Sequence, residues 1–264
     1  MCIKKAGVSA HSGKYALQAA AYDGNIEIIR QLLDKGADVN IQGGTYGNAL
    51  QAAAYMGENE VILLLLDRGA DINAQGGMYG NTLQAAADMG RNEVILLLLE
   101  RGDDINALGG TYGNALQTAA YNGNIEIIRL LLDNGADVNI QGGNALQTAA
   151  YSGNVQAIQL LLDREADINA QGGTYGNALQ AAAYMAGVEV IQVLLARGAD
   201  LNAQGGVYGN ALQAASYMGR FRVIQLLLDK GADVCSQGGK YGTALQAALA
   251  PRPTHFGDKK DNFK

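Results

Sequence analysis

A segment that reads Ala-Leu-Gln-Ala-Ala, with small changes, recurs along this 264-residue chain at an almost constant step of 33 residues. The leucine of each segment, called here the anchor leucine, stands at Leu17, Leu50, Leu83, Leu116, Leu146, Leu179, Leu212 and Leu245. Only the step from Leu116 to Leu146 is shorter, at 30 residues. A fixed period of this length predicts a solenoid, in which each unit buries its apolar face against its neighbours.

The unit from residue 48 to residue 80 shows the parts of the repeat. Asn48 is suited to cap a short first helix of leucine and alanines, because its side-chain oxygen accepts from free backbone amides. Gly57 is suited to end that helix in a left-handed conformation. Aliphatic pairs from Val61 to Leu66 predict one apolar stripe on a second helix. An extended arm and a Gly-Gly turn then lead to the next unit.

A 33-residue unit of turn, two antiparallel helices and a Gly-Ala-Asp-Val-Asn arm resembles the ankyrin repeat. The resemblance covers roughly residues 13–249, and the wording Gly-Gly-x-Tyr-Gly-Asn-Ala-Leu-Gln resembles ankyrin arrays of filamentous fungi. It implies an all-α repeat fold: an ankyrin solenoid of about seven helix-turn-helix units plus a terminal half unit, connected by extended β-turn or hairpin fingers. We therefore divide the chain into an N-terminal extension (1–12), the ankyrin repeat array (13–250) and a polar C-terminal tail (251–264), which we expect to be disordered.

The repeat departs from the usual ankyrin sequence motif at the start of its first helix. Where the family usually has Thr-Pro-Leu-His, this chain has Asn-Ala-Leu-Gln at residues 48–51 and at the equivalent positions. Asparagine keeps the capping role. Glutamine lacks the imidazole of the family's usual hydrogen-bond network, which puts that network in doubt here.

All tyrosines except Tyr15 fall into two columns of the repeat. The first column, the finger tyrosines, lies four residues before the anchor leucine and comprises Tyr46, Tyr79, Tyr112, Tyr175, Tyr208 and Tyr241. The second column, the helix tyrosines, lies five residues after it and comprises Tyr22, Tyr55, Tyr121, Tyr151, Tyr184 and Tyr217, with Asp88 in the third copy. The slot that follows each helix tyrosine, or Asp88, holds methionine in four copies, at Met56, Met89, Met185 and Met218.

Two interpretations of these columns remain open. In ankyrin proteins the end of the first helix and the turn tips usually face the partner, so the resemblance makes both columns and the methionines candidate protein-binding residues. Tyrosine offers rigid contact area with a hydroxyl, and methionine offers adaptable apolar contact. Regular apolar stripes are also typical of packing, and the rings would then stack along the solenoid.

No arrangement of residues in the sequence supports catalysis or a cofactor. Both histidines, His11 and His255, lie outside the repeats, and Cys2 and Cys235 stand far apart. No metal-ligand spacing, no catalytic triad and no phosphate loop of the form Gly-x-x-x-x-Gly-Lys-Ser/Thr occurs. The recurring aspartates are better explained by turn and cap hydrogen bonds than by acid-base chemistry. We therefore expect no enzyme, cofactor, metal or small-molecule substrate.

Charge and hydropathy narrow the class of partner further. The formal net charge is −6, and because both termini are basic the repeats themselves carry about −10, which argues against nucleic acid and anionic membranes as partners. The longest aliphatic run, residues 61–66, is far too short to cross a bilayer. The absence of a signal sequence and of paired cysteines favours a cytoplasmic or nuclear location.

Together these observations predict a non-catalytic protein-protein interaction module, a monomer that binds an unidentified protein through the concave face and turn tips of the array. The alternative is a structural or regulatory spacer or sensor segment of a larger signalling protein, with no dedicated epitope. The sequence also predicts that the array opens most easily between residues 140 and 190, where the fifth copy lacks three residues and Glu165 replaces a helix-ending glycine.

Overall fold

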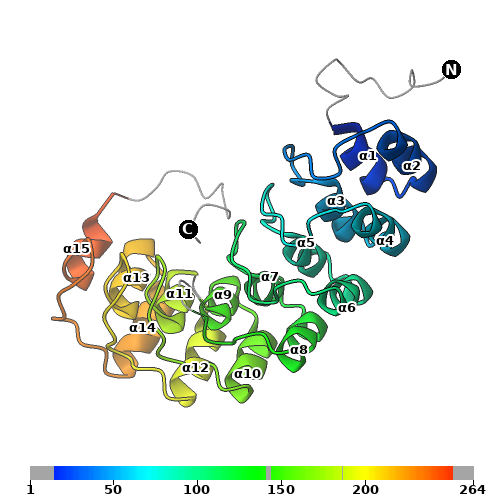
Figure 1. Cartoon of the computed structure of the whole chain (residues 1–264). Coiled ribbons are helices and arrows are strands. Elements are labelled where there is room, and N and C mark those ends of the chain that lie inside the picture. Colours follow the sequence, from blue (N-terminus) through cyan, green and yellow to red (C-terminus); the bar gives the residue numbers. More distant parts are fainter. Residues whose placement is uncertain (1–14, 141–143, 186, 252–264) are drawn as a thin grey trace. The chain divides into compact units, whose positions relative to one another are not determined.

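The computed structural model describes residues 15–140, 144–185 and 187–251. Within these ranges the chain forms fifteen α-helices, and its only β-pairing consists of isolated bridges. Fourteen helices form seven pairs and the fifteenth forms a half unit, which confirms the predicted all-α repeat solenoid (Figure 1). The chain divides between Gly110 and Thr111 into two compact units, called unit 1 and unit 2. No described helix is both long enough and apolar enough to span a bilayer.

Unit 1 contains three helix pairs, arranged as two parallel rows of helices (Figure 1). The row of first helices comprises α1 (Ala16–Tyr22), α3 (Ala49–Met56) and α5 (Thr82–Asp88). The row of second helices comprises α2 (Ile26–Asp34), α4 (Asn59–Asp67) and α6 (Asn92–Glu100). Each helix packs on its partner in the pair and on the next helix of its own row.

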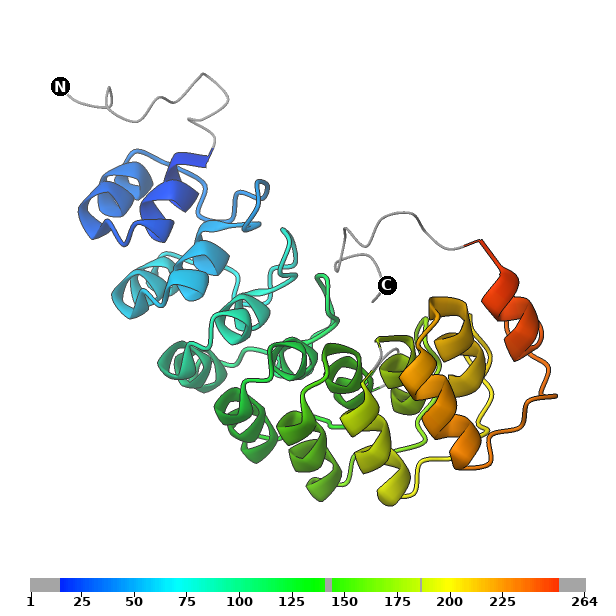
Figure 2. The same cartoon turned by 180° about the vertical axis from the view of Figure 1, so that it is seen from behind.

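Unit 2 contains four helix pairs in the same two rows, followed by one additional first helix at its C-terminal end (Figure 2). Its first helices are α7 (Ala115–Asn122), α9 (Ala145–Ser152), α11 (Ala178–Met185), α13 (Ala211–Met218) and α15 (Ala244–Leu249). Its second helices are α8 (Ile125–Asp133), α10 (Val155–Asp163), α12 (Val188–Ala196) and α14 (Phe221–Asp229).

Five first helices, α3, α5, α7, α11 and α13, begin at a capping box built from the asparagine and glutamine of the repeat. In α15 Thr243 takes the place of asparagine, in α9 Asn144 accepts from the Gln147 amide, and α1 has no side-chain cap. In α3 the Asn48 side chain accepts from the Gln51 backbone amide at 2.8 Å, and the Gln51 side chain accepts from the Asn48 amide at 2.9 Å. Both reciprocal bonds satisfy amides that have no partner within the helix. In α3 the anchor leucine Leu50 and the alanines from Ala52 to Ala54 are buried, and the small alanine side chains let α3 pack closely on α1 and α5.

Glutamine also rebuilds the network that the loss of histidine put in doubt. The Gln51 amide nitrogen donates to the carbonyl oxygens of Gly80 at 3.0 Å and of Ala74 at 3.3 Å, both in the following finger. The glutamines at residues 18, 84, 147, 180 and 213 donate to the equivalent loops. A side-chain amide can accept for the cap and donate to the next unit at once, so this network does not need the imidazole.

The glycine of each Tyr-Gly-Asn segment is required by this network. Gly47 has φ +91°, and a Cβ atom there would lie 1.9 Å from the Gln51 side-chain oxygen. A side chain at this position would therefore be strained and would also displace the cap. In five fingers this glycine forms a bridge with the first glycine of its own turn, as between Gly43 and Gly47.

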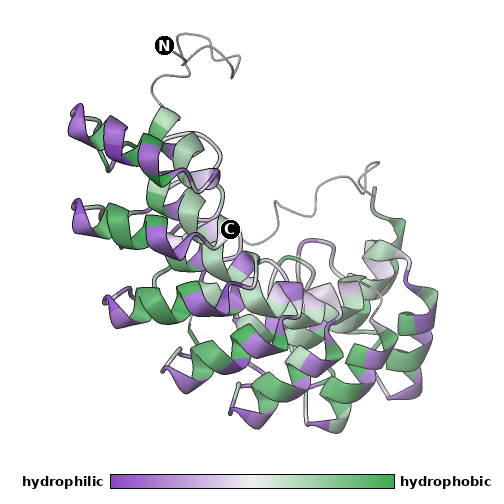
Figure 3. Cartoon of the chain, turned by 90° about the vertical axis from the view of Figure 1, so that its right-hand side faces the viewer, coloured by the Kyte–Doolittle hydropathy of each residue, from purple (hydrophilic) through white to green (hydrophobic). Residues whose placement is uncertain are grey.

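The second helices combine hydrophobic and hydrophilic residues (Figure 3), and their hydrophobic residues include a buried stripe. In α4 the stripe comprises Val61, Ile62 and Leu65, all at most 1% exposed. The aspartates of the arms act in turns, as predicted, since Asp38 accepts from the Asn40 backbone amide at 2.9 Å. Asn40 in turn reaches the next copy, where its side chain accepts from the Asp71 amide at 2.8 Å.

Two irregularities of unit 2 concern its backbone. Glu165 has φ +66° and is the one described residue other than glycine with a positive φ, which confirms the left-handed conformation at this helix end. Residues 141–143 and residue 186, which belong to the predicted opening region, lie outside the described residues, as do the predicted extension and residues 252–264 of the predicted tail. The opening between residues 140 and 190 stays a prediction.

Candidate functional site: the tyrosine ladders

The helix tyrosines stand at the C-terminal ends of the first helices, and the finger tyrosines stand in the turn that precedes the next first helix. Within each unit the two columns interleave. In unit 1 the ring of Tyr46 lies between the rings of Tyr22 and Tyr55, with centroids 5.1 and 5.3 Å away. Tyr79 packs on Tyr55 at 5.0 Å and stacks on Tyr46 at 6.2 Å. We call each interleaved series a ring ladder.

The ring ladder of unit 2 contains eight tyrosines. Consecutive rings lie 4.4 to 6.5 Å apart in the order Tyr112, Tyr121, Tyr151, Tyr175, Tyr184, Tyr208, Tyr217 and Tyr241. The fifth copy lacks a finger tyrosine, and there Tyr121 and Tyr151 stack directly on each other at 6.5 Å. Tilted and offset pairs at these distances are favourable aromatic geometries. The two columns that the sequence separates are therefore one continuous structure in space.

Hydroxyl groups also link the two columns. Tyr46 shares a side-chain hydrogen bond with Tyr22, and Tyr208 shares one with Tyr184. Burial, followed by this hydrogen bond and by the neighbouring tyrosines, raises the pKa of Tyr46 to about 12. Burial raises the pKa values of Tyr79, Tyr175 and Tyr208 further still. These four finger tyrosines are therefore neutral at physiological pH.

Exposure separates the candidate residues into two groups. Tyr151, Tyr175, Tyr217 and Met218 are at most 6% exposed, so their side chains pack inside unit 2 and leave almost no surface for a partner. The other candidates are half-buried, except Met89, which is 39% exposed. This half-exposed group comprises Tyr22, Tyr46, Tyr55, Met56, Tyr79, Tyr112, Tyr121, Tyr184, Met185, Tyr208 and Tyr241. Packing and accessibility thus coexist in the same ladders.

Asp88 interrupts the helix column of unit 1. It occupies the last position of α5, where six other copies have tyrosine, and it is half-buried. Its charge contributes, after burial and the contacts with Tyr55, to the raised pKa of Tyr79. The carboxylate of Asp88 places a negative charge at the end of this ladder, whose other members are tyrosines.

Asp103 is a buried charge that the sequence interpretation missed. It occupies the slot between Gly102 and Asp104, where the other copies have alanine, and it is 7% exposed. Neither carboxylate oxygen has a hydrogen-bond partner among the described residues. Burial, followed by the charge of Asp104, raises the pKa of Asp103 to about 7, and the Asp104 backbone amide offsets part of this effect. The aspartate in an alanine column was the signal available in the sequence.

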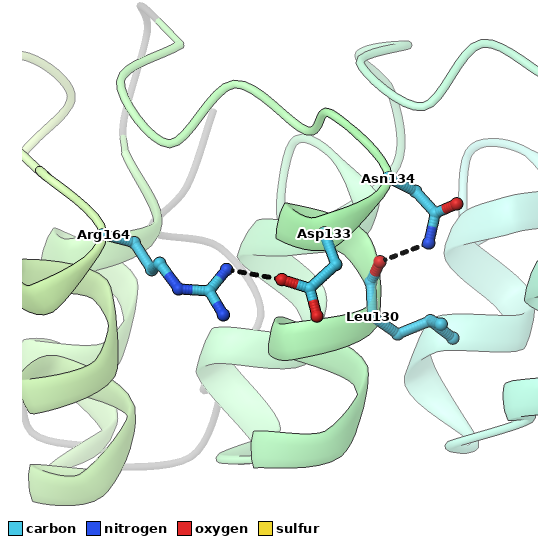
Figure 4. Close-up of polar contacts among 4 residues, drawn as sticks. All are labelled: Leu130, Asp133, Asn134 and Arg164. Atoms are coloured by element: carbon cyan, nitrogen blue, oxygen red, sulfur yellow. Dashed lines mark hydrogen bonds and ion pairs between the residues drawn. The ribbon is translucent and has the colours of Figure 1, made fainter.

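The outer surface of unit 2 shows contacts of a structural kind. Arg164, which follows α10, forms an ion pair with Asp133 at the end of α8, at 2.8 Å (Figure 4). Asn134 caps the same end of α8, since its side chain donates to the Leu130 carbonyl oxygen at 2.8 Å. Exposed ion pairs of this kind contribute about 0.2–1 kcal/mol each. Among the described residues, no three His, Cys, Asp or Glu side chains gather into a possible metal site.

The repeat architecture agrees with comparisons against known families. A family model for ankyrin repeats in three copies matches residues 2–76 and 82–172, and a model for ankyrin repeats in many copies matches residues 179–228. No curated protein matches the chain significantly. Ankyrin repeats are typically non-catalytic modules of protein-protein interaction. The helix pairs, the capped first helices and the matches over most of the sequence show that the chain belongs to the ankyrin-repeat family.

Proposed function

We propose that the array binds a protein partner through the half-exposed part of its ring ladders. The observation that carries this proposal is that each ladder holds its rings in place by stacking and hydroxyl hydrogen bonds while leaving most of them partly accessible. Binding through fixed side chains loses little conformational entropy. Tyrosine also combines a large apolar area with a hydroxyl for polar contacts, which suits a recognition surface.

Variation beside the ladders supports a role in specificity. The slot that follows each helix tyrosine, or Asp88, holds methionine in four copies and aspartate, asparagine or serine in the others, and the exposed members are Asp23, Met89 and Asn122. The finger tips vary in the same way, from Thr45 to the exposed Val207 and Lys240. The fixed rings would supply the same apolar contact in every copy, and the variable side chains beside them would determine which partner is bound. The exposed, unpaired Cys235 favours a reducing, intracellular setting for this binding.

The test compares capture of partner proteins by the native chain and by a variant with Tyr55→Ser, Tyr121→Ser and Tyr184→Ser. These three rings are half-buried and belong to both units, and circular dichroism checks that the variant is folded. A matched control carries Leu96→Ser on α6, where the leucine is 41% exposed and outside the ladders. Captured proteins are identified by mass spectrometry and then titrated singly against both variants.

We expect a partner that binds the native chain and the Leu96 variant with equal affinity. The tyrosine-to-serine variant should bind this partner at least tenfold more weakly, since central aromatic anchors dominate the binding energy of interfaces. A companion variant with phenylalanine at the same three positions separates the rings from their hydroxyls. Equal binding by the native and tyrosine-to-serine chains would contradict the proposal and favour a structural spacer role.

A further inference from the structure

The last helix, α15, presents two leucines to solvent. Leu245 is 72% exposed and Leu249 is 78% exposed, whereas Leu212, the anchor leucine of the copy before, is 3% exposed. The opposite side of α15 is packed, because Ala247 is fully buried against Tyr217 and Met218 of α13. The exposed leucines are four residues apart and therefore share one face of the helix.

In the seven complete copies, a second helix follows the first helix and packs on it, as α14 packs on α13. Its aliphatic stripe is buried; in α14 the stripe includes Val223 and Leu227, both fully buried. The sequence from residue 251 to 264 contains two prolines and no valine, isoleucine or leucine, so it does not repeat this pattern. In each of the seven complete copies, the element that packs on the first helix is thus a helix with a buried aliphatic stripe.

The arm after α14 adds two more apolar side chains at this end. Leu228 is 38% exposed and Val234 is 57% exposed. Their equivalents one copy earlier, Leu195 and Leu201, line a groove together with Lys230, which directly follows α14. The slots of Leu228 and Val234 therefore face the position of the next second helix.

Phe221, at the first position of α14, belongs to the same face and is 81% exposed. Its equivalent in α8, Ile125, lines a groove together with Gln156 and Gln159 of the next second helix, α10. We call the five exposed side chains the C-terminal apolar face: Phe221, Leu228, Val234, Leu245 and Leu249. Phe221, Leu228 and Val234 occupy slots whose equivalents line grooves beside the next second helix, and Leu245 and Leu249 lie on α15, after which no second helix is described.

Charged side chains beside this face indicate the direction in which a helix would lie on it. Second helices usually carry a glutamate in the first turn, and the Asn59 side chain of α4 donates to Glu93 of α6 at 3.2 Å. Consecutive second helices therefore meet at their N-termini. In α14 the glutamate slot holds Arg222, which is exposed.

The other end of α14 has the opposite charge. Asp133 at the end of α8 pairs with Arg164, which follows the next second helix. The equivalent aspartate of α14 is Asp229, which is exposed. An element lying beside α14 in the same direction would thus meet a cation at its start and an anion at its end.

We propose that the C-terminal apolar face docks an amphipathic helix of another protein, parallel to α14. The docked helix carries a stripe of branched aliphatic residues, an acidic first turn and a basic residue at its end. A second copy of this chain is a poorer match, because its own second helices already bury their stripes, with Ile62, Ile95 and Ile128 fully buried. This inference does not depend on the ring ladders.

The test uses a fluorescein-labelled peptide with the sequence of residues 124–137 and the substitution Asn134→Arg. Its α8 segment has the required stripe, an acidic first turn and an asparagine cap, and the substitution adds the basic residue that follows α10 as Arg164. Fluorescence anisotropy measures its binding to the native protein. The protein variant Leu245→Asp with Leu249→Asp should bind at least tenfold more weakly, because an apolar anchor becomes charged. A control peptide with Ile128→Lys and Leu131→Lys should not bind. Both leucines are solvent-exposed, so the variant should fold, which circular dichroism checks.

Charge reversal tests the orientation of the helix. The protein variant Arg222→Glu should weaken the native peptide about threefold at low salt. A peptide with Glu126→Arg should regain that loss on the Arg222→Glu protein, and 0.5 M salt should remove both effects.

Three results would overturn the proposal. The first is no binding of the native peptide, and the second is equal binding by the native protein and the double leucine variant. The third comes from sedimentation velocity: a native protein that self-associates, with a monomeric leucine variant, would assign the face to a second copy. The tyrosine-to-serine variant should bind the peptide unchanged, so failure of the partner surface on the ladders would not affect this result.

Discussion

Units 1 and 2 are built from the same repeat, but they depart from it in different ways. In unit 1 the departures are charged side chains on an undisturbed backbone: Asp88 stands in a tyrosine slot and Asp103 in an alanine slot. In unit 2 every complete copy keeps its tyrosines, and the departures are in the backbone: three residues are missing before Asn144, and Glu165 takes a left-handed conformation.

The difference shows that the series of stacked rings depends on the tyrosine side chains and tolerates a change in loop length. Where unit 2 lacks a finger tyrosine, the helix tyrosines Tyr121 and Tyr151 meet directly, so a shortened loop leaves the series of rings intact. Where unit 1 replaces a ring by a carboxylate, no such compensation is available to Tyr79. Because each copy interacts only with its neighbours, both kinds of departure have local effects on stability.

The largest expected effect comes from Asp103→Ala in unit 1, which restores the alanine of the other copies. Raising the pKa from 3.8 to about 7 corresponds to about 4 kcal/mol at pH 8, since one unit equals 1.36 kcal/mol. Between pH 3.8 and 7 the folded chain binds more protons than the unfolded chain, so this penalty grows as the pH rises. The variant should be more stable than the native chain in urea at pH 8, and the gain should shrink towards pH 5.

The control for this prediction is Asp104→Asn, at an exposed neighbour whose side chain accepts from the Asn106 amide. It keeps the acceptor and removes the neighbouring charge that helps to raise the pKa of Asp103, so it should gain less stability than Asp103→Ala. A gain for Asp103→Ala that stays the same from pH 5 to pH 8 would show that charge burial is not its cause.

The next effect concerns the most buried ring of the unit 2 ladder. Tyr175→Ala should lower the free energy of unfolding by about 3 kcal/mol, because a large aromatic side chain leaves a cavity. Tyr175 is 3% exposed and contacts Tyr151, Tyr184 and Tyr208. Tyr175→Phe keeps the stacked ring and should therefore lose much less stability than Tyr175→Ala. Equal losses in urea denaturation would mean that the hydroxyl, and not the stacked ring, stabilises the ladder.

A smaller effect is expected when the ladder of unit 1 is completed. Asp88→Tyr should place a ring beside Tyr79 in the way that Tyr55 packs on Tyr46, 5.3 Å away. An added aromatic pair should stabilise unit 1 by about 1.5 kcal/mol. Hydrogen exchange of α5 reads this locally, with Asp88→Asn as the control that removes only the charge. Protection that rises equally in both variants would assign the effect to the charge alone.

The smallest effect concerns the backbone of unit 2. Glu165→Gly should raise stability by about 1 kcal/mol, because glycine adopts the left-handed conformation without the strain of a side chain. Hydrogen exchange should show the gain in α10 and the arm after it. Glu165→Ala is the matched control, which removes the carboxylate and keeps the strain. If both substitutions had the same effect, the backbone strain at this position would be negligible.

Much of the local structure was predictable from single copies. The cap at Asn48, the helix end at Gly57, the stripe from Val61 to Leu66 and the turn role of Asp38 each follow from residues within one unit. The hydrogen bonds of Gln51 were not predictable in this way. They reach residues 23 to 29 positions further along the chain, and their geometry exists only when two units are stacked.

The sequence by itself determined the period, the helix pairs and the acidic charge of the repeat, because these depend on residue types at short spacing. Only the tertiary structure decided that the two tyrosine columns form one ladder within each unit, that Tyr151 is buried while Tyr55 in the equivalent slot is half-buried, and that Asp103 lies away from water. The same residue type occurs in equivalent slots of the sequence. Burial depends on which neighbours surround each slot in space, and those neighbours differ from copy to copy.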